Sequence, residues 1–204
     1  MVRNLILAAL LATLLVAPPA ARADGDPASD YLISQTVFFP FDTTIPRAQQ
    51  ERLFALTANA AKKGYPIRVA LISSRYDLGS VTILWGAPQR YATFLSREDL
   101  FVFKGPLLVV MPHGLGFWWP NHETTAQQKL IRQIRVPPGQ TGLATAAENA
   151  VQRLAAASGV HVTADATSAS HRNRNDRLII IVAVVAALGL GLIVRNLLRR
   201  RRRA

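Results

Sequence analysis

Ile67-Arg68-Val69-Ala70-Leu71-Ile72 is a nearly continuous apolar stretch. A run of this kind predicts a strand that is covered on both faces, as the strands of parallel sheets are. Leu107-Leu108-Val109-Val110-Met111 is a second run of the same kind. Residues 80–104 between them are long enough to carry a helix, which favours a parallel pair joined by a crossover. The two runs therefore predict an α/β fold.

Helical patterns fill the segments around these strands. Residues 46–63 place Leu53, Leu56 and Ala60 at helical spacing, and Gly64 follows them as a cap. The helix begins at a proline, which suits the first turn of a helix. Further helices are expected over residues 88–100, 124–135 and 141–157, with a helical turn at 80–85.

Two more strands complete the predicted sheet. The run Tyr31–Phe39 is rich in β-formers and ends at Pro40, after a polar lead-in over residues 24–30. Residues 115–119 follow a turn at His113-Gly114, which makes the last pair of strands antiparallel. We therefore expect a mixed β-sheet flanked by helices, an α/β sandwich within residues 24–157.

The first segment of the chain has the features of a secretory signal peptide. Arg3 precedes an apolar run from Leu5 to Val16, and Ala21-Arg22-Ala23 forms a small-x-small cleavage site. The apolar run is shorter than the roughly 20 residues that a membrane-spanning helix needs. We expect residues 1–23 to be removed after Ala23, and an uncleaved anchor is the alternative.

Residues 178–194 carry no charge and are almost wholly apolar. Because lipid offers no partner to backbone N–H and C=O groups, so apolar a segment is expected to be helical in a membrane. If Arg195 extends its guanidinium to the interface, residues 178–198 are long enough to span the bilayer. The small and polar residues 158–177 then form a linker between the domain and this transmembrane helix.

Arginines predict the orientation of the span. Those on its C-terminal side are Arg195, Arg199, Arg200, Arg201, Arg202 and Arg203, whereas Arg172, Arg174 and Arg177 precede it. The excess places the C-terminus in the cytoplasm, so we expect a single-pass type I protein of the cell membrane whose folded domain lies outside. The tail, residues 199–204, also suits contact with anionic membrane lipid, at about 1 kcal/mol per arginine. A cytoplasmic binding motif is the alternative for the tail.

Charge and composition exclude several classes of function. The chain has a net charge of +12, but residues 24–170 contain 13 Lys or Arg and 11 Asp or Glu, so the basic excess lies at the ends. A nucleic-acid partner needs a basic face on the folded domain, and none is expected here. The chain has no cysteine, which excludes disulfides, thiol nucleophiles and Cys-ligated metals. Arg outnumbers Lys by 20 to 4, which indicates a GC-rich bacterial genome and a bacterial envelope protein.

Four features follow one another along the chain: the amphipathic helix at 46–63, the strand at 67–72, the stretch Gly105-Pro106-Leu107-Leu108-Val109-Val110 and the hairpin into Gly114-Leu115-Gly116-Phe117. Together they resemble a TPM domain. TPM domains are exported α/β modules that one C-terminal membrane helix often tethers. The resemblance spans residues 31–157 and implies the α/β sandwich. Some family members are acid phosphatases or metal binders that use acidic residues beside an arginine in this hairpin. Here the hairpin reads Met111-Pro112-His113-Gly114, without a carboxylate, so the resemblance supports the fold and weakens the enzymatic interpretation.

Candidate ligand-binding residues follow the two buried strands. In open α/β sheets, ligands bind beyond the carboxyl ends of parallel strands. Arg75 and Asp77 follow the first run and His113 follows the second, so these side chains are candidates to bind a cation or an anion. The alternative is a solvated loop in which Asp77 caps the next helical turn.

Other motifs give no catalytic site. His122 and Glu123 lack the second histidine of a helical zinc signature, so surface positions are favoured for them. No nucleophile elbow, P-loop or dinucleotide fingerprint occurs, and no cofactor is expected. Strand alternation predicts Phe117 and Trp119 on one face of the sheet and Trp118 on the other, with core packing favoured over an exposed contact.

The function expected from the sequence is a membrane-tethered extracytoplasmic α/β module that contacts another envelope protein and is not catalytic. The grounds are the lack of a catalytic constellation, the nearly neutral domain and the predicted membrane tether. The alternative is a TPM-type phosphatase or another metal-assisted hydrolase, in which Asp77 and Arg75 are the residues available for chemistry.

Overall fold

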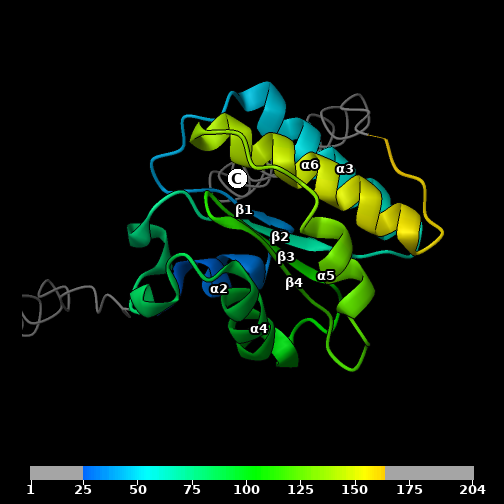
Figure 1. The fold of residues 1–204 in the computed structure, drawn as a ribbon, viewed down its shortest axis with the longest axis horizontal. Helices are drawn as coiled ribbons and strands as arrows, with labels where there is room; N and C mark the ends of the chain where they lie inside the picture. Colours follow the sequence, from blue (N-terminus) through cyan, green and yellow to red (C-terminus); the bar gives the residue numbers. More distant parts are fainter. Residues whose placement is uncertain (1–24, 164–204) are drawn as a thin grey trace, which may run out of the picture.

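A four-stranded sheet forms the centre of the structure, a computed structural model that describes residues 25–163 (Figure 1). The strands lie in the order in which they occur in the chain. β1 pairs with β2 and β2 with β3 in parallel, whereas β3 and β4 are antiparallel. The predicted mixed sheet is therefore confirmed. The strand bounds are β1 (Val37–Phe38), β2 (Arg68–Leu71), β3 (Leu107–Met111) and β4 (Gly114–Trp118).

Helices cover both faces of this sheet. α3 (Arg47–Lys62) and α6 (Gly139–Ala157) pack side by side on one face, with α5 (Thr125–Ile131) beside them (Figure 1). α2 (Pro27–Leu32) and α4 (Pro88–Glu98) pack on the other face. The predicted α/β class and its flanking helices are confirmed.

Side chains alternate between the two faces along the buried strands. In β2, Val69 and Leu71 face the α3/α6 layer, and Ala70 faces the α2/α4 layer. Leu108 and Val110 of β3 face α3/α6 in the same way, and the alternate β3 residues face α2/α4. Each of these side chains is fully buried, which is why both strands read as continuous apolar runs in the sequence.

The two parallel crossovers differ in hand. β1, β2 and β3 follow one another across the sheet. The first crossover carries α3 over one face, and the second carries α4 over the opposite face. Two crossovers that step in the same direction over opposite faces have opposite hands, so one of them departs from the right-handed preference. Because α4 lies on the opposite face of the sheet, the face that α3 covers has room for α6, which packs along α3.

The tryptophan-rich strand takes the predicted alternation. Phe117 is buried with the α3/α6 core and Trp119 packs against the same core, whereas Trp118 packs against the α2/α4 core. Gly116 lets α4 approach this strand, because a Cβ at that position would lie 2.1 Å from the backbone oxygen of Pro88. The prediction of core packing on opposite faces is confirmed.

The predicted strand over Tyr31–Phe39 is wrong for most of its length. Residues 27–32 form α2, and the strand is confined to Val37–Phe38. Asp26 caps the helix by accepting a hydrogen bond from the backbone N–H of Ala28 (3.2 Å), and Pro27 occupies the first turn. An N-cap followed by proline is a helix-start signal, and here it overrides the β-propensity of the residues that follow.

The other predicted helices are found with shifted ends. α4 ends at Glu98 and continues as a 3₁₀ turn, η3 (Asp99–Phe101). α5 ends at Ile131, four residues before the predicted end, and Pro137 and Pro138 precede α6. Two more 3₁₀ turns, η1 (Arg75–Leu78) and η2 (Thr82–Leu84), lie between β2 and α4.

The predicted signal peptide (1–23), transmembrane helix (178–198) and arginine tail (199–204) lie outside the described residues. Within residues 25–163, none of the helices has the length and apolarity to cross a membrane. The described chain ends on the α3/α6 layer, where Val162 is buried and the Nζ of Lys63 donates to the carbonyl oxygen of His161 (2.6 Å).

Candidate functional site

A cleft of about 350 Å³ lies at the carboxyl ends of β2 and β3. This is the edge at which open α/β sheets bind ligands, and the sequence predicts a site there. We call it the strand-end cleft. Its lining residues are Asp42, Ser73, Ser74, Pro112, Pro137, Gly139, Gln140 and Leu143.

Gln140, in the first turn of α6, ties the walls of the strand-end cleft together. Its Oε1 accepts from the backbone N–H of Thr44 (2.7 Å), and its Nε2 lies 3.4 Å from both the Asp42 carbonyl oxygen and Ser73 Oγ. The N-cap of α6 is Pro138, which offers no side-chain cap. The cleft therefore presents hydroxyls, an amide and one carboxylate, with no Lys or Arg in its lining, and suits hydrogen bonding to a small polar group.

Asp77 is a structural residue of the loop after β2. It is 1% exposed, and its Oδ2 accepts from the backbone N–H groups of Ser73 and Ser74, both at 2.8 Å. The two serine hydroxyls donate to the same oxygen at 3.0 and 3.3 Å. Ser74 and Asp77 form a capping box at the start of η1, so Asp77 performs the capping role that the sequence offers as an alternative.

Arg75 and His113 lie outside the strand-end cleft. Arg75 is exposed on η1. His113 is exposed in the turn between β3 and β4, where its ring packs edge-on against Trp85 with the ring centroids 4.9 Å apart. No hydrogen bond, ion pair or ring contact within the described residues joins His113 to Arg75 or Asp77. The three predicted ligand-binding residues follow strands that end at one edge of the sheet and do not line the strand-end cleft, so their binding role stays a prediction.

His122 and Glu123 are surface residues with local partners. The His122 ring stacks on Trp119 at 3.9 Å, and its Nδ1 lies 2.8 Å from the Pro120 carbonyl oxygen. Hydrogen bonds from Thr125 lower the pKa of the Glu123 carboxyl. Across residues 25–163, no group of three or more His, Asp or Glu side chains is placed to hold a metal ion.

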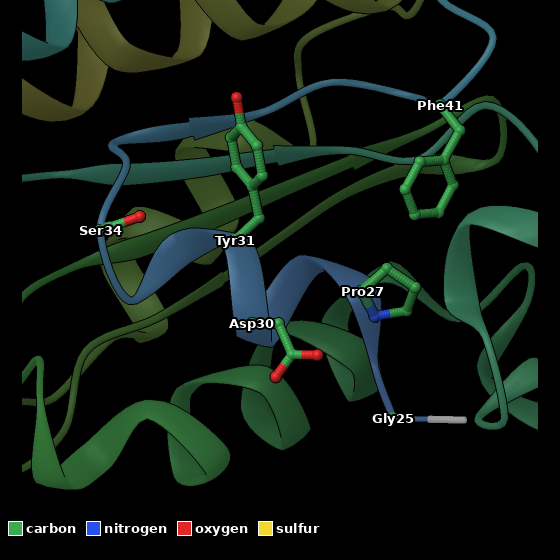
Figure 2. A pocket seen from close by; sticks show the side chains of 6 residues that line it. All are labelled: Gly25, Pro27, Asp30, Tyr31, Ser34 and Phe41. Atoms are coloured by element: carbon green, nitrogen blue, oxygen red, sulfur yellow. The ribbon is translucent and has the colours of Figure 1, made fainter. Parts of the chain in front are cut away.

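A second hollow, of about 410 Å³, lies beside α2 (Figure 2). We call it the aromatic hollow. Tyr31 rises from α2, and Phe41 reaches in from the loop that follows β1 (Figure 2). Tyr31 is 44% exposed and Phe41 is 71% exposed. Both rings pack edge-on against the buried ring of Phe38, at 5.8 and 5.9 Å. The lining residues are Gly25, Pro27, Asp30, Tyr31, Ser34 and Phe41.

Two buried carboxyl groups hold the segment that forms this hollow. Asp26 Oδ1 accepts a hydrogen bond from the hydroxyl of Tyr91 on α4 (2.6 Å). Burial raises the pKa of Asp26 to about 6 against these hydrogen bonds, and the nearby charge of Asp99 raises it further. Burial likewise raises the pKa of Asp99 to about 6, while the Arg68 guanidinium and the Ser29 hydroxyl lower it.

Arg68 neutralises this cluster only in part. Its guanidinium lies over the Phe103 ring at 4.0 Å, and one of its NH groups donates to the Ile33 carbonyl oxygen (3.3 Å). Burial lowers the pKa of Arg68. Among the described residues, Asp26 Oδ2, Asp99 Oδ2 and one Arg68 nitrogen are buried without a hydrogen-bond partner. The cluster thus holds polar atoms that the fold does not satisfy.

Sequence reasoning missed the aromatic hollow and the carboxyl pair beneath it. Asp26-Pro27 is a helix-start signal for α2, whereas the polar composition of residues 24–30 indicates only a lead-in to a strand. No local pattern pairs Asp26 with Tyr91, which lies 65 positions further along the chain.

Comparisons with known proteins identify no family for this three-layer α/β domain. No family model matches the chain, and neither a curated protein nor a solved structure matches it.

Proposed function

We propose that the protein is a membrane-tethered extracytoplasmic α/β module of the TPM type that contacts another envelope protein and does not catalyse a reaction. One observation carries the proposal: Tyr31 and Phe41 are exposed, yet both rings are fixed edge-on against the buried Phe38. Rigid exposed aromatic rings give a large contact area at a low cost in conformational entropy, as protein interaction sites do.

The lining of the aromatic hollow indicates the chemistry of the partner. Its walls are two aromatic rings and Pro27, and Asp30 is its single charged lining residue. A protein segment that inserts an apolar side chain and carries a Lys or Arg beside it would match both features. The hollow lies on the α2 side of the sheet, whereas the described chain ends on the α3/α6 layer, so the two are on opposite sides of the sheet.

The hydrolase alternative gains no supporting observation from the described residues. Oδ2 of Asp77, the carboxylate proposed for that chemistry, already accepts four hydrogen bonds within its own loop. Arg75 points to solvent and does not line the strand-end cleft. The interaction module is therefore the better-supported proposal.

Site-specific crosslinking in the native membrane tests the proposal. A photoreactive phenylalanine analogue at position 41 of the full chain should form a defined adduct with one envelope protein. The same analogue at position 101 should not, because Phe101 is 97% exposed but is not one of the residues that line the hollow. Adding Tyr31→Ala to the first variant should reduce the adduct at least several-fold. Equal adducts at positions 41 and 101 would contradict the proposal.

A further inference from the structure

We propose that α2, and with it the aromatic hollow, is seated on the domain by proton binding to the paired carboxyl groups of Asp26 and Asp99. Acidification would then hold the hollow in the conformation described here, and loss of the proton would loosen it. The inference goes beyond the docking function and does not depend on it, because it follows from contacts within the domain.

α2 depends on tertiary contacts for its stability. It has six residues, too few for a helix to be stable by itself in water. Its apolar contacts with the domain come from Ala28 and Leu32, both fully buried, and from the Tyr31 ring against Phe38. Its polar contacts include the Asp26–Tyr91 hydrogen bond at one end, the hydrogen bond between Ser29 and Asp99, and the hydrogen bond from Arg68 to Ile33 at the other end.

The surface on which α2 packs carries an excess of buried negative charge. Asp26 is 8% exposed and Asp99 is 2% exposed, and one oxygen of each carboxyl group lacks a partner. Two ionised carboxylates with one guanidinium leave a net charge of −1. Arg68 lies within 4.0 Å of neither carboxylate, since the ion pairs of the described residues are Arg47–Glu51 and Arg52–Glu148. One proton would neutralise the cluster and remove the cost of a buried unpaired charge.

The charged groups that face Asp26 and Asp99 are mostly negative. Asp26 faces Tyr91 on α4, Asp99 on η3 and Asp30 on α2 itself. β1, which also packs on α2, contributes only Val37 and Phe38. η1 contributes Arg75 and Tyr76, both exposed, and Asp77, whose negative charge acts on Tyr91. Asp99 faces Arg68, Glu98 and Asp30. All of the facing charges except those of Arg68 and Arg75 are negative, so the surroundings favour the protonated pair.

The direction of the response follows from these pKa values. Both carboxyl groups have a pKa of about 6 in the folded domain, above the ordinary value of 3.8. The folded domain therefore binds protons more tightly than the unfolded chain, and the seat is firmest below pH 6 and weakens as the pH rises through 6. The phenol of Tyr91 stays protonated throughout, because burial and the nearby carboxylates raise its pKa. The α2 segment supplies most of the lining of the hollow, so the hollow should loosen when the segment does. The lining residues that it supplies are Gly25, Pro27, Asp30, Tyr31 and Ser34.

Hydrogen–deuterium exchange on the full chain in lipid nanodiscs tests the inference. After correction for the intrinsic pH dependence of amide exchange, residues 27–36 should be protected about tenfold more at pH 5 than at pH 7.5 for each carboxyl group that titrates. Amides of β3 that exchange only through global unfolding should gain protection by the same factor, because unfolding exposes the same two carboxyl groups. Equal protection of residues 27–36 at the two pH values would overturn the inference.

Neutral variants separate this mechanism from a general effect of pH. Asp26→Asn with Asp99→Asn should give pH-independent protection of α2, and Asp42→Asn, at an exposed carboxyl group, should keep the wild-type response. If the double variant does not fold, Tyr91→Phe provides a second test.

The Tyr91 hydrogen bond lowers the pKa of Asp26, so its loss in Tyr91→Phe should move the midpoint of the transition to higher pH. An unchanged pH dependence in the double variant, or a midpoint that Tyr91→Phe does not move, would contradict the inference. The result of the exchange experiment does not decide the result of the crosslinking experiment, so each of the two proposals can fail without the other.

Discussion

The side chain of Gln89 bonds both backbone groups of Phe117. Nε2 of Gln89 donates to the Phe117 carbonyl oxygen (2.9 Å), and the Phe117 N–H donates to Oε1 of Gln89 (3.0 Å). β4 is an edge strand of the sheet, and the amide takes the position that the next strand would occupy. Edge strands with unpaired backbone groups invite pairing with other chains. α4 therefore protects this edge through one side chain.

Gln89→Ala should destabilise the domain by about 1–2 kcal/mol, because Phe117 loses both hydrogen-bond partners. Urea unfolding followed by tryptophan fluorescence measures the change, with Gln35→Ala at an exposed position as the control. The variant should also self-associate more strongly during refolding. A stability equal to that of the control would mean that water replaces the amide without cost.

Gly116→Ala should be the more damaging substitution on the same strand. The added Cβ would lie 2.1 Å from the backbone oxygen of Pro88, so α4 has to move, at a cost of about 1–3 kcal/mol or more. Gly64→Ala is the matched control. It meets no atom within 4 Å and pays only the strain of a positive φ of 90°, about 1 kcal/mol. A smaller loss for Gly116→Ala than for Gly64→Ala would contradict this account of the α4–β4 contact.

The sequence predicts the central strands well because each is buried on both faces. Val69 and Ala70 face opposite layers, yet both are fully buried, so an unbroken apolar run marks the strand. α2 fails this logic, since its Tyr31 begins a run rich in β-formers, whereas the helix is fixed by a cap and by Tyr91 on a distant helix. Local propensity cannot report a contact between residues so far apart in the chain.

The position of the strand-end cleft also follows from sequence, whereas its lining does not. The rule that ligands lie beyond the ends of parallel strands locates Ser73 and Pro112. Gln140 joins this site by bonding Thr44, 96 positions earlier, which depends on how α6 docks against α3. Arg75 and His113 follow the strands closely in sequence, but their side chains are exposed outside the cleft.

Asp77→Ala should cost about 2–3 kcal/mol of stability, because two backbone N–H groups and two hydroxyls lose their acceptor. Arg75→Ala, at an exposed position of the same turn, should change stability by less than about 0.5 kcal/mol. Thermal unfolding of the two variants provides the comparison. A stable Asp77→Ala protein would show that the loop after β2 does not need this carboxylate, and would reopen a ligand-binding role for it.

The predicted topology can be tested apart from the fold. Protease applied to intact spheroplasts should digest the domain and spare a tag placed after Ala204, since the arginines that follow the predicted span are expected in the cytoplasm. Replacing Arg199 to Arg203 with lysines should leave this pattern and the protein level unchanged, because orientation depends on charge. Loss of the tag together with the domain would contradict the single-pass arrangement.

Stability should rise as the pH falls from 7 to 5, the reverse of the usual acid response. A carboxyl group whose pKa is raised to about 6 in the folded domain contributes stability that is complete below the unfolded value of 3.8 and is lost as the pH rises through 6. Between pH 7 and pH 5, Asp26 and Asp99 should each contribute about 1 kcal/mol. Urea unfolding across this range measures the slope, and Asp26→Asn should remove about half of it. A free energy of unfolding that is flat or falls toward pH 5 would show that the two carboxyl groups ionise normally in the folded domain.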